Sequence, residues 1–262
     1  MMMNIEKYVR VSSLKEAHGI LKSEKGACVL GGCGYLRMGR KKITTAIDLT
    51  DLGLSYIRET SNAIDIGAMT PLRDIETSTL LEETFGSALR VCTEGIVGIQ
   101  LRNVVTIGGT VAGRYPFSDV IPVLMALGAR VHISESETMD IEKYMEAKSV
   151  EGIITKISIP KDGQVAHFTS VRNSETDYAV LNCAVSLKQG EYSIFVGARP
   201  QRSVRAVEAE KIINSGRSLE QAGAAAAEEL TFGDNTRGSA AYRKALCKTL
   251  VKRAIEGVIH AI

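Results

Sequence analysis

The pattern of predicted secondary structure changes near residue 152. Up to that point helices and strands alternate. Ser13 and Glu16 form a capping-box pattern that starts a helix, and residues 27–30 are a short apolar strand running into Gly31. The other elements expected here are strands at 43–49, 63–68, 104–107 and 130–134, and helices that begin at Thr70, span about 79–94 and begin at Ser118.

Strand-like sequence dominates after residue 152, with little helix between the strands. The stretches are 152–160, 165–171, 180–187 and 192–196. Their connections are too short for parallel crossovers, so we expect antiparallel pairing. Two helices, at about 203–213 and 239–260, close the chain, with an alanine-rich stretch at 222–227 between them. The sequence therefore predicts an α+β protein whose last third is an antiparallel sheet with helices.

Charge and cysteine usage exclude several classes of partner. The chain has 32 basic and 30 acidic residues, a net charge of +2, which gives no reason to expect nucleic acid or an anionic membrane. We expect no membrane span and no secretory signal, and therefore a cytoplasmic protein. The five cysteines form no CxxC pair and the four histidines are isolated, so we expect no metal site. The cysteines are Cys28, Cys33, Cys92, Cys183 and Cys247.

Two glycine pairs, each at the end of a predicted strand, are the best candidates for chemistry. The first is Gly31-Gly32 and the second is Gly108-Gly109. Glycines allow positive φ and leave no Cβ between backbone and ligand, so successive N–H groups can bind phosphate oxygens. The alternative is that each pair is only a tight turn. Neither loop matches a Walker or Rossmann motif, since no G-x-G-x-x-G is present.

Asp119 follows the second glycine pair by ten residues, at the start of a predicted helix. Its carboxylate could cap that helix, or it could accept hydrogen bonds from the hydroxyls of a ribose. Residues Arg102 and Asn103, before the second loop, could form an exposed turn or orient the loop. The residues alone leave these alternatives open.

Residues 98–133, GIQLRNVVTIGGTVAGRYPFSDVIPVLMALGARVHI, resemble the signature of FAD-binding subunits and domains of the xanthine dehydrogenase family. Carbon monoxide dehydrogenase medium subunits and 4-hydroxybenzoyl-CoA reductase flavin subunits share that signature. The sequence VLGGCGYL at 29–36 is similar to the first flavin loop of the family, and the resemblance covers essentially the whole chain. Downstream, Arg172, the stretch 177–179 and the stretch 238–243 resemble its C-terminal domain.

The resemblance implies a two-subdomain α/β FAD-binding domain of the PCMH type at 1–160, with subdomains at about 1–55 and 56–160. A C-terminal flavoprotein domain at 163–262 would follow. FAD would be bound noncovalently, its diphosphate by the two loops and its ribose by Asp119. The FAD-binding residues implied by motif match are Val29, Leu30, Gly31, Gly32, Cys33, Gly34, Tyr35, Leu36, Thr106, Ile107, Gly108, Gly109, Thr110, Ser118 and Asp119.

The same resemblance implies an oxidoreductase subunit that is inactive on the organic substrate alone. Its partners would be a 2Fe–2S subunit and a large molybdopterin subunit, and it would pass electrons to an acceptor such as NAD. No side chain need act as acid or base, so we name no catalytic residue. Cys33, Gly34, Thr110 and Ala112 depart from the family pattern. Two alternatives therefore stay open: a structural subunit without FAD, and a non-redox nucleotide binder.

Overall fold

The computed structural model describes residues 3–40, 42–134 and 137–261. The chain is divided into two compact units that interleave in sequence. Unit 1 comprises Met1–Asp74, Ile99–Gly113 and Arg130–Ile159, and unit 2 comprises Ile75–Gly98, Arg114–Ala129 and Pro160–Ile262. Among the helices in the described ranges, none has the length and apolarity that a membrane crossing needs.

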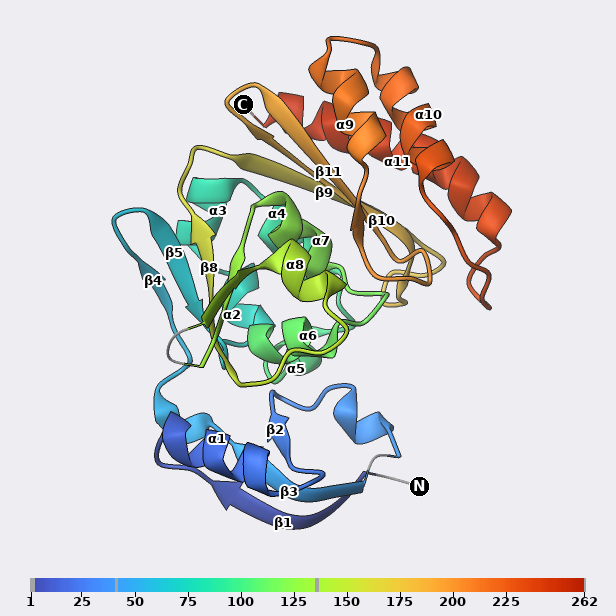
Figure 1. Cartoon of the computed structure of the whole chain (residues 1–262). Coiled ribbons are helices and arrows are strands. Elements are labelled where there is room, and N and C mark those ends of the chain that lie inside the picture. The colour runs from blue at the N-terminus through green and yellow to red at the C-terminus, as the bar shows by residue number, and fades with distance from the viewer. Residues whose placement is uncertain (1–2, 41, 135–136, 262) are drawn as a thin grey trace. The chain divides into compact units, whose positions relative to one another are not determined.

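Unit 1 begins with a small parallel sheet (Figure 1). Its strand order is β1 (Asn4–Arg10), β3 (Lys42–Asp48), β2 (Cys28–Leu30). Helix α1 (Leu14–Ser23) begins as predicted, because the Ser13 hydroxyl accepts a hydrogen bond from the N–H of Glu16 at 3.1 Å. Its Ala17 packs with Ile47 of β3, which forms the core of this part. Two short 3₁₀ helices, η1 (Leu36–Met38) and η2 (Thr50–Leu52), follow β2 and β3.

The rest of unit 1 contains a five-stranded sheet. Its order is β4 (Ile57–Glu59), β5 (Ala63–Gly67), β8 (Ile154–Pro160), β6 (Arg130–Ile133), β7 (Glu137–Asp140). The helices of this part are α2 (Leu72–Glu76), α5 (Ile99–Arg102), α6 (Ile107–Gly113) and α8 (Ile141–Glu146). Strands β5, β6 and β8 lie close to their predicted positions, whereas β1, β4, β7 and α8 were not predicted.

A row of polar side chains crosses this sheet from β5 to β7. Asp65 accepts hydrogen bonds from Lys156 Nζ at 2.6 Å and from Ser158 Oγ at 2.5 Å. Ser158 Oγ also lies 2.8 Å from His132 Nε2, and His132 Nδ1 lies 3.1 Å from Thr138 Oγ1. The serine hydroxyl is therefore held between a carboxylate and an imidazole. Burial would raise the pKa of Asp65, but the bonds from Lys156 and Ser158 outweigh burial and lower that pKa.

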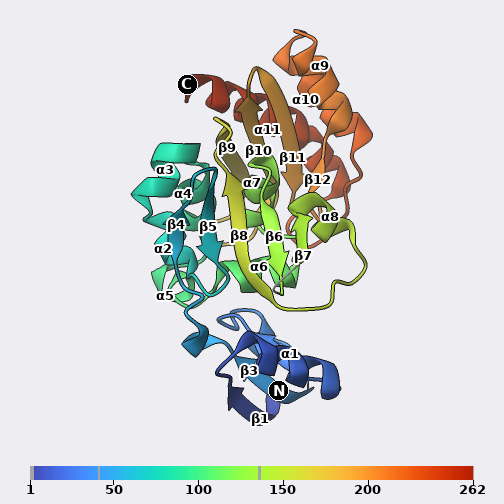
Figure 2. The same cartoon turned by 60° about the vertical axis from the view of Figure 1, so that its left-hand side comes forward.

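Unit 2 is a four-stranded antiparallel sheet with helices on both faces. The sheet order is β12 (Val204–Arg205), β11 (Glu191–Gly197), β10 (Ala179–Lys188), β9 (Val165–Arg172). Figures 1 and 2 show α9 (Val207–Asn214), α10 (Leu219–Glu229) and α11 (Ala240–His260) over one face. Helices α4 (Ala88–Glu94) and α7 (Val120–Ala126) pack on the other face, and α3 (Thr79–Phe85) precedes α4. The predicted antiparallel pairing is thus confirmed for β9, β10 and β11, whereas the strand predicted at 152–160 forms β8 of the five-stranded sheet.

The single helix expected at 79–94 is wrong, because Gly86 divides it. Gly86 has a φ of 77° and ends α3 by donating its N–H to the Glu82 carbonyl at 2.9 Å. A side chain at Gly86 would also approach Val165 Cγ1 of β9 to 3.1 Å. The helical periodicity on both sides of this glycine concealed the break.

Alanines and glycine set the spacing of the helices that cover the sheet. Ala222 and Ala226 of α10 are buried, and a Cβ on Gly223 would lie 2.4 Å from the Lys248 carbonyl oxygen of α11. The alanine-rich stretch is therefore plain helix that allows two helix backbones to approach closely, as the sequence indicates.

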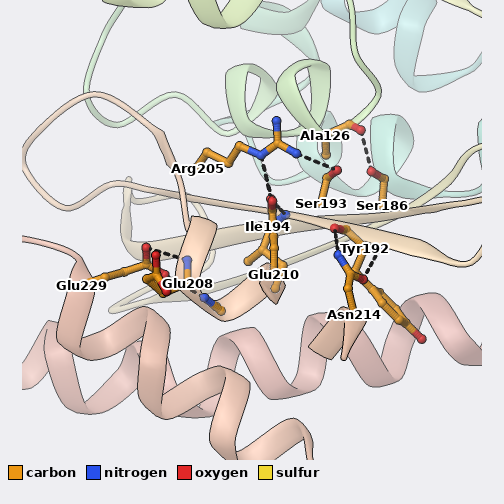
Figure 3. Close-up of polar contacts among 11 residues, drawn as sticks. Ala126, Ser186, Tyr192, Ser193, Ile194, Arg205, Glu208, Glu210, Asn214 and Glu229 are labelled. Atoms are coloured by element: carbon orange, nitrogen blue, oxygen red, sulfur yellow. Dashed lines mark hydrogen bonds and ion pairs between the residues drawn. The ribbon is translucent and has the colours of Figure 1, made fainter. Parts of the chain in front are cut away.

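Side-chain hydrogen bonds join helix α9 to the backbone of β11 and to the Arg205 side chain of β12 (Figure 3). The buried Glu210 carboxylate accepts from the Ile194 N–H at 2.7 Å and from Arg205 Nε at 2.9 Å. At the other end of the helix, Asn214 bonds both the N–H and the carbonyl of Tyr192, at 2.8 and 3.1 Å. Each end of α9 thus has its own attachment to the sheet.

Arg243 joins the start of α11 to strand β10 and to the loop before the helix. Its side chain is fully buried, with Nε donating to the Val180 carbonyl at 2.8 Å. Other guanidinium N–H groups donate to the carbonyls of Gly233, at 2.7 Å, and of Gly238, and to Asn235 Oδ1 at 2.6 Å. All four partners are neutral acceptors, so in the described part of the chain hydrogen bonds and not an ion pair satisfy this buried guanidinium.

Candidate functional site

The first glycine loop leaves strand β2 in an unusual backbone conformation. Gly32 and Cys33 have φ values of 73° and 58°, both in the left-handed region. A Cβ on Gly32 would lie 1.7 Å from the Val104 carbonyl oxygen, so only glycine fits at this position. Cys33 adopts positive φ although it carries a side chain, which is uncommon for a residue of its type. The chain then enters η1, where the N–H of Arg37 donates to the Cys33 carbonyl at 3.2 Å.

Three successive amides of this loop have no hydrogen-bond acceptor in the part of the chain that the structure describes. They are the N–H groups of Gly32, Cys33 and Gly34. Gly34 is buried, where an unpaired amide is costly unless a ligand supplies the acceptor. Burial raises the pKa of the Cys33 thiol, and the backbone of Gly31 opposes that rise. Consecutive unpaired amides suit an anion with several oxygens, and the diphosphate of FAD is such a group.

The second glycine pair lies in a helix and not at the end of a strand, so the strand predicted at 104–107 is wrong. Thr106 forms one isolated bridge to Pro71, and Ile107 already begins α6. Thr106 Oγ1 accepts from the N–H of Gly109 at 3.1 Å, as a capping residue would. This cap and the contacts to the chain after β5 outweigh the strand preference of the β-branched residues at 104–107.

The amides of the second loop are already bonded within unit 1. Ile107 donates to the Thr70 carbonyl at 3.0 Å, Gly108 to the Ala68 carbonyl at 2.9 Å, and Gly109 to Thr106. These three amides are therefore not available to phosphate, and the unpaired amides of the site come from the first loop. Of the pair before this loop, Arg102 is buried at the end of α5, whereas Asn103 lies exposed in the turn that follows.

The two loops pack against each other, and the glycines make the approach possible. A Cβ on Gly31 would lie 2.8 Å from Gly109 Cα, and one on Gly109 would lie 2.4 Å from the Gly31 carbonyl oxygen. A Cβ on Gly34 would likewise meet Val105 Cγ2 at 2.6 Å. The structure thus brings together the loops that the sequence singled out, although they are separated by more than 70 residues of chain.

Ser118 and Asp119 belong to unit 2 and precede α7. Asp119 occupies the N-cap position, but its side chain makes no capping bond; Ser118 Oγ accepts from the N–H of Ile121 at 3.3 Å. The Asp119 carboxylate instead accepts from Arg172 Nη2 at 2.6 Å and from Asn182 Nδ2 at 2.7 Å. Its capping role is therefore wrong, while its ribose role stays a prediction.

Burial governs the electrostatics of Asp119, which is 4% exposed. Burial raises the pKa of this carboxyl, and Arg172 and Asn182 oppose that rise. The ion pair involves residues 53 positions apart in sequence, Asp119 directly before α7 and Arg172 at the end of β9. Local sequence patterns could not predict this ion pair, although Arg172 is one of the residues that carry the family resemblance.

An aromatic cluster beside this ion pair was not predicted. The Tyr115 and Phe117 rings stack with centroids 5.2 Å apart, and Phe117 lies 4.3 Å from Tyr178. The Arg237 guanidinium lies 4.8 Å from the Tyr178 ring centroid and also bonds Asp177 at 2.8 Å. In the sequence, this cluster could have been suspected only from the aromatic residues close to Ser118 and from the Asp177-Tyr178 pair.

Comparisons with known proteins agree with this architecture. A family model described as the FAD binding domain in molybdopterin dehydrogenase matches residues 2–162. A second model, described as the CO dehydrogenase flavoprotein C-terminal domain, matches residues 166–258. The uncharacterized protein YgfM of Escherichia coli K12 is 30% identical over 212 residues, which cover 80% of this chain and 78% of that protein.

Two further similarities cover nearly the whole chain. The glyceraldehyde dehydrogenase medium chain of Sulfolobus acidocaldarius is 26% identical over 275 residues, covering 96% of this chain and 97% of that one. A chain of the reconstituted CO dehydrogenase from Oligotropha carboxidovorans superposes with a TM-score of 0.89 at 25% identity, with 99% of both chains covered. The predicted fold class, an FAD-binding type of domain followed by an antiparallel sheet with helices, is confirmed.

Proposed function

Because this chain belongs to the family of FAD-binding domains of molybdopterin dehydrogenases, we propose that it is the flavin subunit of a molybdenum hydroxylase. In this role it relays electrons from the 2Fe–2S centre of a partner subunit to an outside acceptor such as NAD. The observation that carries the proposal is the set of unpaired amides at Gly32, Cys33 and Gly34. They lie in the loop that resembles the family's first flavin loop.

The residues of this chain bind and orient the cofactor. The amides of the first loop hold the diphosphate, the packed second loop fixes their position, and the proposed ribose contact comes from the Ser118–Asp119 segment. When bound, a flavin can accept electrons singly and release them in pairs, and the protein supplies its binding and surroundings. No side chain of this chain acts as an acid or base in the proposal.

The partners are proposed from the names of the relatives and from what this chain lacks. Relatives are named as the medium chain of glyceraldehyde dehydrogenase and the medium subunit of nicotine 6-hydroxylase, which places each in an assembly of several chains. The sequence offers no CxxC pair for a cluster. We therefore assign the cluster and the molybdopterin to two other subunits. The five cysteines are free thiols, in keeping with a reducing, cytoplasmic location.

The test begins with the visible absorption spectrum of the purified chain after incubation with FAD and removal of the unbound flavin. We expect a bound flavin spectrum, and acid precipitation should leave the flavin in the supernatant, as noncovalent binding requires. A chain that stays colourless with FAD would contradict the proposal, and one that binds other nucleotides equally well would favour a non-redox nucleotide binder. A separate assay tests whether NAD can exchange electrons with the flavin: the flavin-loaded chain should oxidise NADH in the presence of an artificial acceptor.

A further inference from the structure

The carboxylate of Asp119 is held by side chains from two strands of unit 2. Arg172, at the end of β9, donates Nη2 to one carboxylate oxygen at 2.6 Å. Asn182, in the middle of β10 and fully buried, donates Nδ2 to the other oxygen at 2.7 Å and also to the Ser118 carbonyl at 3.1 Å. One amide nitrogen thus contacts both residues of the Ser118–Asp119 pair.

The surroundings of Arg172 fix the guanidinium in this position. Its Nη1 donates to the Asp177 carbonyl at 2.7 Å, which ties it to the loop between β9 and β10. On the side of α4, a Cβ on Gly95 would lie 3.0 Å from Arg172 Nη2, so a glycine there leaves room for the guanidinium. The titratable and charged groups that face Asp119 are Arg172 and the buried thiol of Cys92 on α4.

Helix capping does not explain these contacts. Ser118 already caps α7, and the Asp119 side chain makes no bond to the helix N–H groups. A buried ion pair is also weak evidence for a role in stability, because desolvation offsets much of the attraction. The contacts do restrict the conformation of Ser118 and Asp119, which are the two residues of unit 2 proposed to contact FAD.

We infer that Arg172 and Asn182 are positioning residues of the flavin site, which hold the Asp119 carboxylate and so set the conformation of the Ser118–Asp119 segment. The inference rests on the proposed function, since it requires that FAD binds. It predicts that FAD affinity depends on Arg172 through Asp119, although Arg172 itself need not touch the cofactor.

The experiment measures the Kd of FAD for the flavin-free full chain, by quenching of flavin fluorescence, from pH 6 to pH 9. Arg172→Met should weaken FAD binding by about tenfold or more at high pH, the effect of losing one hydrogen bond to a charged group. Without Arg172 the pKa of Asp119 rises further, and the ionised carboxylate then lacks its counter-charge. The affinity of this variant for FAD should therefore fall as pH rises, while the affinity of the wild type should not change with pH.

The double variant Asp119→Asn with Arg172→Met should lose this pH dependence, because no carboxyl is left to ionise. A matched control is Arg205→Met, which also removes an arginine from a buried carboxylate of unit 2, Glu210. It should change the melting temperature but neither the Kd nor its pH profile. Arg172→Lys, which keeps the charge, should recover part of the affinity.

If Arg172→Met fails to fold, Arg172→Ala can be assayed with added ethylguanidinium. Arg172 lines a pocket of about 440 Å³ together with Gly95 and Ser170, which gives the small cation a route to the vacated position. Recovery of FAD affinity with the cation supports the inference. Unchanged affinity in Arg172→Met, or no effect of the cation in Arg172→Ala, overturns it while leaving the proposed function intact. A wild-type chain that binds no FAD overturns both.

Discussion

Gly31 and Gly109 lie so close that a methyl group on Gly109 would sit 2.4 Å from the carbonyl oxygen of Gly31. The glycines of the two loops are therefore required for packing between backbones. This differs from the simplest interpretation of such glycines, in which the missing Cβ leaves room for a ligand. This close packing also couples the two loops, so a substitution that displaces one loop will displace the other.

Gly109→Val should abolish FAD binding and lower stability by about 1–3 kcal/mol, because the added side chain must displace the first loop. Flavin content and urea unfolding check the two effects. Gly19→Ala is the matched control, since Gly19 lies on the exposed side of α1 with no atom within 4 Å of an added Cβ. It should raise stability by about 0.5–1 kcal/mol and leave FAD binding unchanged. Normal flavin content in Gly109→Val would show that loop packing is not needed for binding.

Gly32→Ala and Gly53→Ala separate backbone strain from steric clash. Both glycines have positive φ, 73° and 65°, but a Cβ on Gly53 meets nothing within 4 Å. The Gly53 variant should therefore lose only about 1 kcal/mol, the cost of left-handed backbone for a residue with a Cβ. The Gly32 variant should show the same loss of stability, and it should also fail to bind FAD, since its Cβ would overlap the Val104 carbonyl. Equal FAD affinity in the two variants would argue against the first loop as the diphosphate site.

Arg243→Lys should destabilise the chain by about 2–4 kcal/mol, because a lysine cannot reach four acceptors and leaves buried carbonyls unpaired. Chemical unfolding of the flavin-free protein measures this loss. As a comparison, Lys244→Arg alters the next residue, whose amine bonds Glu228 at 2.7 Å and is partly exposed. It should change stability by less than about 0.5 kcal/mol. A similar small effect at both positions would mean that Arg243 is not an anchor of α11.

The free energy of unfolding should decrease as pH falls below about 6.5, the usual pKa of histidine in an unfolded chain. Burial lowers the pKa of His132, with Lys156 adding to the effect, and burial also lowers that of His167. The unfolded state therefore takes up protons that the folded state does not, and stability falls as the pH drops from about 6.5 towards the lower folded pKa values. Urea unfolding at several pH values measures the slope.

His132→Gln should reduce this slope, because an amide can still donate to Ser158 but does not titrate. Adding His167→Gln should reduce it further. An unchanged slope in the double variant would assign the pH dependence to other groups.

The sequence predicted the features that depend on neighbouring residues. The cap at Ser13, the alanine-rich helix α10 and the antiparallel pairing of β9, β10 and β11 follow from local pattern and short connections. The predicted capping box is only half formed, because the Glu16 carboxylate accepts from the N–H of Ser12 and not from that of Ser13. The strand expected at 104–107 failed, because Thr106 and the carbonyls of Ala68 and Thr70 stabilise a helix start against the strand preference. Local propensity is a weak prior where such tertiary bonds compete.

The candidate site was only partly predictable for the same reason. Motif resemblance singled out both glycine loops, and the structure confirms that they are adjacent. The resemblance could not predict that the amides of Ile107 and Gly108 are bonded internally, since their acceptors are about 40 residues earlier in the chain. Nor could it predict the Arg172–Asp119 pair, whose members are 53 residues apart. These relationships arise only when strands and loops distant in sequence are packed together.

The interleaving of the two units limits how the chain can be shortened. All seven residues of α7 are buried, and the helix packs on β10 and β11, which are synthesised more than 50 residues later. A fragment that ends near residue 160 would expose this apolar helix to water, with nothing of the later sheet to cover it. We therefore expect that the stretch matching the flavin-binding family model does not fold independently. During translation, α7 can pack on α4 but not on β10 or β11 until the C-terminal hairpins leave the ribosome. Expression of the first 160 residues alone should therefore give aggregated protein.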